Sequence, residues 1–166
     1  MVEDILQKQR DFFKAGYTLN VNGRRAVLQI LANTIKEMEG EILEALKAAL
    51  GKSDTESYMC EVGLALSEIR DTRKHLRRWA RTRFAPTPLA QFPSRSRIIP
   101  EPYGNVLIMA PWNYPFLLCI SPLVSALAAG NTAIIKPSAY APATSAIVKK
   151  IIDETFTEDY VAVVEG

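Results

Sequence analysis

Residues 105–164 determine the fold class, and they read NVLIMAPWNYPFLLCISPLVSALAAGNTAIIKPSAYAPATSAIVKKIIDETFTEDYVAVV. Short apolar runs alternate in this stretch with segments of helical spacing. The apolar runs are 105–110, 132–136 and 160–164, and the helical segments are 115–129 and 142–156. Strands that alternate with helices of about fifteen residues indicate βαβ units and a parallel sheet. We therefore predict an α/β fold with a Rossmann-like parallel sheet, whose first strand is covered on both faces.

Helical patterns dominate the part of the chain that precedes residue 85. This part contains no proline up to Phe84. Residues 23–50 carry apolar side chains three and four positions apart, which predicts one long helix. Gly51 suits the left-handed residue that ends such a helix. Ser53 and Glu56 form an S-x-x-E capping box, which predicts the start of a second long helix that extends to Trp79. A shorter helix is expected before Gly16.

Five of the ten prolines lie within residues 85–104, so no helix continues there. Residues 94–99 alternate in polarity as an exposed strand does. We expect an N-terminal helical segment (1–84), a bridging arm or hairpin (85–104) and the first part of an α/β domain (105–166). A doubly wound sheet that ends on its third strand is half a domain, so the chain is expected to be a truncated piece of a longer protein.

Composition excludes several classes of protein. The chain has 166 residues, 48% of them hydrophobic and 23% charged, with a net charge of +2, which is typical of a globular protein rather than a disordered or disulfide-rich one. No apolar run reaches the ~18 residues of a membrane span. The two cysteines, Cys60 and Cys119, favour a reducing cytoplasm, and both are predicted to be small buried hydrophobes. No metal-ligand spacing is present, and His75 is the only histidine.

Two polar residues occupy positions where an open parallel sheet binds ligands, beyond the carboxyl ends of its strands. Asn113 follows the first predicted strand, and Lys136 ends the second. A carboxamide beside a helix N-terminus can donate a hydrogen bond to an oxyanion, but Asn is also a favoured N-cap residue. Lys136 can reach a ribose or phosphate, or it can rest its stem on the sheet edge with its charge in water.

A basic run at residues 74–83 suggests a different function. Its cations and Trp79 are compatible with a nucleic-acid patch. They are also compatible with the solvated C-terminal end of a long helix, where cations are favourable. Since the rest of the chain shows no further basic face, we expect no nucleic-acid partner.

Four motifs together resemble the start of the cofactor domain of aldehyde dehydrogenases. They are EPYGNVLIMAPWNYPF at 101–116, AAGNT at 128–132, KPS at 136–138 and VAVV at 161–164. The resemblance extends to LAQF at 89–92 and to the N-terminal helices, so it covers nearly the whole chain. The form PWNYPF is similar to the class-3-like branch, which oxidises medium-chain, long-chain or aromatic aldehydes.

The resemblance implies roles for particular residues. Asn113 would donate to the oxyanion that forms when a cysteine thiolate attacks the aldehyde, and a glutamate would activate the hydrolytic water. Tyr114 and Leu118 would line the aldehyde tunnel. The groups that bind NAD or NADP would be Pro111, Trp112, Lys136, Ser138 and Ala139. The complete enzyme would be a homodimer with a small-molecule aldehyde as its substrate, and residues 105–166 would begin its NAD(P)-binding domain.

The sequence departs from the family pattern in two respects. Many members have a glutamate where this chain has Ala139; without that carboxylate we expect NADP to be tolerated at least as well as usual. The family's nucleophile and general base both follow the third strand, so the 166 residues alone are expected to be inactive. The alternative is a non-catalytic, truncated homologue that binds a nucleotide or assembles with a partner.

Overall fold

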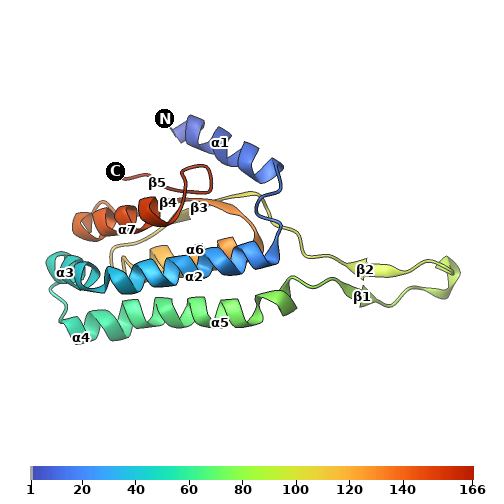
Figure 1. The fold of residues 1–166 in the computed structure, drawn as a ribbon, viewed down its shortest axis with the longest axis horizontal. Helices are drawn as coiled ribbons and strands as arrows, with labels where there is room; N and C mark the ends of the chain where they lie inside the picture. The colour runs from blue at the N-terminus through green and yellow to red at the C-terminus, as the bar shows by residue number, and fades with distance from the viewer. Residues whose placement is uncertain (1) are drawn as a thin grey trace.

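The computed structural model describes residues 2–166 (Figure 1). Its helices are α1 (Val2–Lys14), α2 (Val21–Glu37), α3 (Glu39–Leu50), α4 (Asp54–Ser57), α5 (Gly63–Trp79), α6 (Leu117–Ala129) and α7 (Pro142–Thr155). A π turn, η1 (Tyr58–Val62), joins α4 to α5, and a short 3₁₀ helix, η2 (Leu89–Gln91), lies in the arm. The strands are β1 (Arg83–Ala85), β2 (Ser96–Ile98), β3 (Asn105–Met109), β4 (Thr132–Lys136) and β5 (Val161–Val163).

A parallel sheet in the order β3-β4-β5 forms the centre of the fold, which confirms the predicted α/β class. α6 connects β3 to β4, and α7 connects β4 to β5. The sheet lies between α1 on one face and the layer containing α6 and α7 on the other (Figure 1). The predicted strands and helices of this region are confirmed, with their ends shifted by one or two residues.

Most of the apolar core lies on one side of the sheet, where α2, α3 and α5 pack around α6 and α7. On the other side, Ile5 of α1 packs against Ile134 and Ala162. α1 leaves part of β3 uncovered, so the side chains of Leu107 and Met109 are 61% and 70% exposed. The prediction that the first strand is covered on both faces is therefore wrong for the described chain.

The long helix predicted over 23–50 is interrupted at Met38, whose backbone leaves the helical region with φ −99° and ψ 13°. Figure 1 shows that α3 does not continue the line of α2. The apolar spacing runs through the break, since Ile35, Met38 and Ile42 are all buried. Periodicity alone therefore concealed it. Thr34 Oγ1 donates to the carbonyl of Ile30 at 3.2 Å, a contact that tends to bend helices.

The start of the second long helix is confirmed. Ser53 Oγ accepts from the amide of Glu56 at 3.3 Å, and Gly51 adopts the left-handed conformation (φ +68°) that ends α3. What the periodicity did not predict is the π turn η1, in which the Gly63 amide donates to the carbonyl of Tyr58, five residues earlier.

β1 and β2 pair antiparallel in a hairpin that extends away from the rest of the protein (Figure 1). The strand predicted over 94–99 is thus confirmed for Ser96–Ile98. Apolar side chains of the hairpin are exposed, including Phe84, Leu89 and Phe92. Within residues 2–166, none of the helices is long and apolar enough to cross a bilayer.

Candidate functional site

The carboxyl ends of β3 and β4 meet at one edge of the sheet. Met109, the last residue of β3, is in register with Lys136, the last residue of β4. The amide of Ala110 then donates to the carbonyl of Lys136 at 3.1 Å. The turn that carries Asn113 therefore starts beside Lys136, as the sequence predicted for a parallel sheet.

Asn113 is exposed in this turn, and its carboxamide has no hydrogen-bond partner among residues 2–166. It does not cap the next helix, so that alternative is wrong: the N-cap of α6 is Phe116, which makes no side-chain cap. The reason is local. Pro115 disfavours helical backbone at Tyr114, and the helix begins only at Leu117. The donor hydrogens of Asn113 are thus left available to a ligand.

Lys136 is half-buried at the end of β4, and its Nζ donates to the backbone oxygen of Gly166, beyond β5. Its ammonium group therefore lies at the sheet edge, in an exposed position. In the turn that follows, Ser138 Oγ accepts from the amide of Tyr140 at 3.2 Å. Ala139 is exposed, and its methyl group offers neither a donor nor a negative charge.

The remaining predicted residues flank the same turn. Pro111 is exposed, Trp112 is 55% exposed and Tyr114 is 42% exposed, whereas Leu118 is partly buried in the first turn of α6. These residues form a mostly apolar surface next to the Asn113 carboxamide. Four hollows of about 300–580 Å³ lie elsewhere on the protein, and neither Asn113 nor Lys136 lines any of them.

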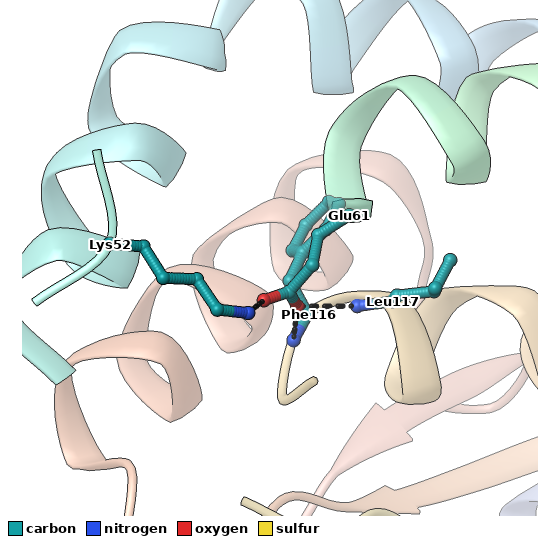
Figure 2. A network of polar contacts seen from close by, with 4 residues as sticks. All are labelled: Lys52, Glu61, Phe116 and Leu117. Carbon is teal, nitrogen blue, oxygen red and sulfur yellow. Dashed lines mark hydrogen bonds and ion pairs between the residues drawn. The ribbon is translucent and has the colours of Figure 1, made fainter. Parts of the chain in front are cut away.

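A buried carboxylate that the sequence analysis did not predict, that of Glu61, binds the backbone amides that directly follow this turn. The side chain of Glu61 is 0% exposed. Glu61 Oε2 accepts from the amides of Phe116 and Leu117 at 2.9 and 3.1 Å, and Oε1 accepts from Lys52 Nζ at 2.6 Å (Figure 2). Two signals could have suggested it. Glu61 is an acid among the buried positions of its helix, and the first turn of α6 has no acid of its own.

The cysteines differ in accessibility. Cys119 is fully buried in α6, as predicted. Burial raises the pKa of its thiol to about 12, and the negative charge of Glu61 adds to the shift. Such a thiol is not a nucleophile near neutral pH. Cys60 lies in the π turn beside exposed Met59 and is only partly buried, so the prediction of full burial is wrong for it.

The basic run of 74–83 lies on the last turns of α5 and in the segment after it. Arg77 donates to Asn22 Oδ1 at 3.0 Å, and the His75 ring lies 5.6 Å from that of Trp79. Arg77 and Arg78 lie in the last helical turn, where positive charge is favourable. Among residues 2–166, no group of three or more His, Cys, Asp or Glu side chains is placed to hold a metal ion.

Comparison with known proteins yields one consistent family. The model described as "Aldehyde dehydrogenase family" matches residues 1–166. The chain is 45% identical, over 166 residues, to 4,4'-diaponeurosporen-aldehyde dehydrogenase of Staphylococcus aureus, covering all of this chain and 36% of that protein. It is 38% identical, over 163 residues, to Aldehyde dehydrogenase family 3 member H1 of Arabidopsis thaliana, covering 98% of this chain and 34% of the relative.

A solved structure titled "Substrate bound state of Staphylococcus Aureus AldH" superposes with a TM-score of 0.98 and 44% identity. The superposition covers 100% of this chain and 36% of that one. The chain therefore spans about a third of the length of the curated relatives it matches.

Proposed function

The chain belongs to the aldehyde dehydrogenase family, and from this premise we propose that it is part of a longer NAD(P)-dependent enzyme that oxidises an aldehyde to a carboxylic acid. One observation carries the proposal. The free carboxamide of Asn113 belongs to the turn that leaves β3, and that turn starts beside Lys136 at the end of β4. An oxyanion donor and a cofactor-binding cation at one sheet edge are what this reaction needs.

Asn113 is proposed as the oxyanion donor. When a thiolate attacks an aldehyde, negative charge develops on the carbonyl oxygen, and a fixed N–H donor stabilises that charge. The carboxamide suits this role because no group of the described chain occupies its donor hydrogens. The attacking cysteine is proposed to lie outside these 166 residues, since Cys119 is buried with a raised thiol pKa and Cys60 does not match the nucleophile motif.

Lys136, Ser138 and Ala139 are proposed to bind the cofactor, with Pro111 and Trp112 lining the same cleft. The fit is chemical: a lysine ammonium held at the sheet edge and a neighbouring serine hydroxyl suit ribose hydroxyls or phosphates. Bound NAD(P) supplies the hydride acceptor of the reaction. Because Ala139 brings no carboxylate, we propose that the 2′-phosphate of NADP is not repelled there.

Tyr114 and Leu118 are proposed to line the path of the aldehyde. They follow Asn113 in sequence, Tyr114 in the same turn and Leu118 in the first turn of α6. The S. aureus relative is named a 4,4'-diaponeurosporen-aldehyde dehydrogenase, and the side chains of Trp112, Tyr114 and Leu118 are mostly apolar. This supports an apolar aldehyde as the substrate class.

Three parts of the chain are proposed to serve this enzyme: the helical segment 1–84, the arm 85–104 and the start of the NAD(P)-binding domain at 105–166. Exposed apolar side chains on the arm, including Phe84 and Leu89, support a homodimer of the complete enzyme. The two free cysteines support a reducing, cytoplasmic location.

A direct assay of NAD(P)H formation tests the function. The longer protein that contains these residues should oxidise medium-chain or aromatic aldehydes with either cofactor, and the 166 residues alone should form no NAD(P)H. NAD should bind no more than about a hundredfold more tightly than NADP, the factor that ~2.8 kcal/mol of discrimination gives.

Two results would point to the alternative, a nucleotide-binding or assembly module without catalysis. One is a longer protein that binds NAD(P) but oxidises no aldehyde. The other is a native polypeptide that ends at Gly166. NAD(P)H formation by the 166 residues, abolished by Cys119→Ala, would instead show that the nucleophile has been misplaced.

A further inference from the structure

We propose that Glu61 and Lys52 are positioning residues for the oxyanion donor Asn113. They act from the N-terminal helical segment on a turn of the α/β sheet. The inference rests on the proposed function, because it assigns Asn113 a partner in the reaction. In this proposal Glu61 and Lys52 contact neither the aldehyde nor the cofactor, and they fix the position of the Asn113 carboxamide.

The first support is the way α6 begins. The first amides of a helix have no partner within the helix, and a buried helix end needs an acceptor for them. α6 has neither a side-chain cap nor an acid in its first turn. Its amides at Phe116 and Leu117 instead donate to one oxygen of Glu61, 55 and 56 residues away in sequence. A distant carboxylate therefore fixes the start of the helix in space.

The second support is the counter-charge. An isolated carboxylate with 0% exposure is costly to bury. Lys52 Nζ donates to Glu61 Oε1 at 2.6 Å, and its side chain is only 10% exposed. The same ammonium lies 4.3 Å from the centre of the Tyr114 ring, within the range of a cation–π contact. Lys52 thus links the carboxylate to the residue next to Asn113.

The third support is the way in which Asn113 is held. Its side chain makes no hydrogen bond within the described chain. The residues on its C-terminal side are held by the Glu61–Lys52 pair. The Lys52 ammonium lies over the Tyr114 ring, and the Phe116 amide donates to Glu61 (Figure 2). A donor gains its effect from being placed in advance where charge develops. Removing the contacts that fix the start of α6 should therefore lower kcat, because the carboxamide of Asn113 would no longer be held in place.

The test is a double-mutant cycle in the longer enzyme that contains these residues. Glu61→Ala should lower kcat by at least about tenfold, and by no more than Asn113→Ala does, since a displaced donor keeps part of its effect. In the Asn113→Ala background, Glu61→Ala should change kcat by less than about twofold, because the group it positions is gone. Dissociation constants for NAD(P) should stay within about twofold of wild type.

Two further variants keep the test decisive. Glu61→Gln combined with Lys52→Met retains an oxygen for both amides without an unpaired charge, and it should recover kcat to within about threefold of wild type. If Glu61→Ala yields no folded enzyme, the cycle is run with Lys52→Met, which should lower kcat severalfold in wild type and not in Asn113→Ala. Glu41→Gln is the matched control, because it breaks an exposed Glu–Lys pair of 2.7 Å between α3 and α7 that shares no polar contact with Glu61 or Lys52. It should leave kcat unchanged.

The outcomes separate the two proposals. If Glu61→Ala lowers kcat by the same factor in the wild-type and the Asn113→Ala backgrounds, Glu61 has only a structural role. A full kcat in the Glu61→Ala enzyme would show the same. If Asn113→Ala itself leaves kcat unchanged, or if the wild-type enzyme oxidises no aldehyde, the proposed function fails before the role of Glu61 is reached.

Discussion

At the scale of single residues, the chemistry of Cys119 depends on the burial of its thiol. Its thiol lies in α6, in the same core as Phe116 and Ile120 and within the field of Glu61. Desolvation favours the neutral thiol, which is why its pKa rises from 9.0 to about 12. The same reasoning applies to Tyr160, whose phenol pKa burial raises to about 12.

These shifts predict how stability depends on pH. The unfolded thiol loses its proton near pH 9, whereas the folded one keeps it to about pH 12. The stabilising contribution of Cys119 is therefore complete below pH 9 and is lost as pH rises from 9 to 12. In that window the free energy of unfolding should fall with a slope of ~1.4 kcal/mol per pH unit for this group.

Urea denaturation between pH 8 and pH 11 measures that slope. Cys119→Ala should flatten it by about 1.4 kcal/mol per pH unit above pH 9. An unchanged slope in Cys119→Ala would contradict the burial account of this thiol.

At the scale of elements, the π turn η1 contains Glu61, whose side chain reaches the start of α6. Its five-residue hydrogen bond brings the carbonyl of Tyr58 to the amide of Gly63. A Cβ at position 63 would lie 3.0 Å from that carbonyl oxygen and 3.3 Å from the Tyr58 ring. Close approach thus favours glycine there, although glycine is ordinarily unfavourable in a helix.

Replacing two helical glycines tests this preference. Gly63→Ala should destabilise the protein by about 1–3 kcal/mol through overpacking. Gly40→Ala, in α3 with no atom within 4 Å of the new Cβ, should stabilise it by about 0.5–1 kcal/mol. The free energies of unfolding in urea give both values. A stabilising Gly63→Ala would show that the π turn tolerates a side chain.

Local sequence patterns predicted the strands and helices well, but they did not predict the break between α2 and α3 or the contacts between distant elements. The apolar runs around Ile108, Ile135 and Ala162 predicted the strands because a buried strand leaves a continuous signature. The break at Met38 was missed because the apolar spacing continues across it. Glu61 was missed for a different reason: the amides of Phe116 and Leu117, which donate to it, are 55 and 56 residues away, and no local pattern records a contact of that range.

At the scale of the whole molecule, the described chain carries apolar surface that its own elements do not cover. Leu107 and Met109 on the sheet and Phe92 on the arm are exposed. The prediction that a strand is covered on both faces assumed that the covering elements are present. The family resemblance, confirmed over all 166 residues, identified the sheet edge, but the tunnel and cofactor cleft are proposed to be completed by chain that these residues do not include.

The central claim is that Asn113 donates to a reacting carbonyl oxygen at the edge shared by β3 and β4. The most direct measurement is kcat for aldehyde oxidation by the longer enzyme carrying Asn113→Ala, together with its dissociation constant for NAD(P). The account predicts a fall in kcat of about 10²–10³ with cofactor binding nearly unchanged. A variant that turns over at the wild-type rate, or one that loses activity only because it no longer binds the cofactor, would contradict it.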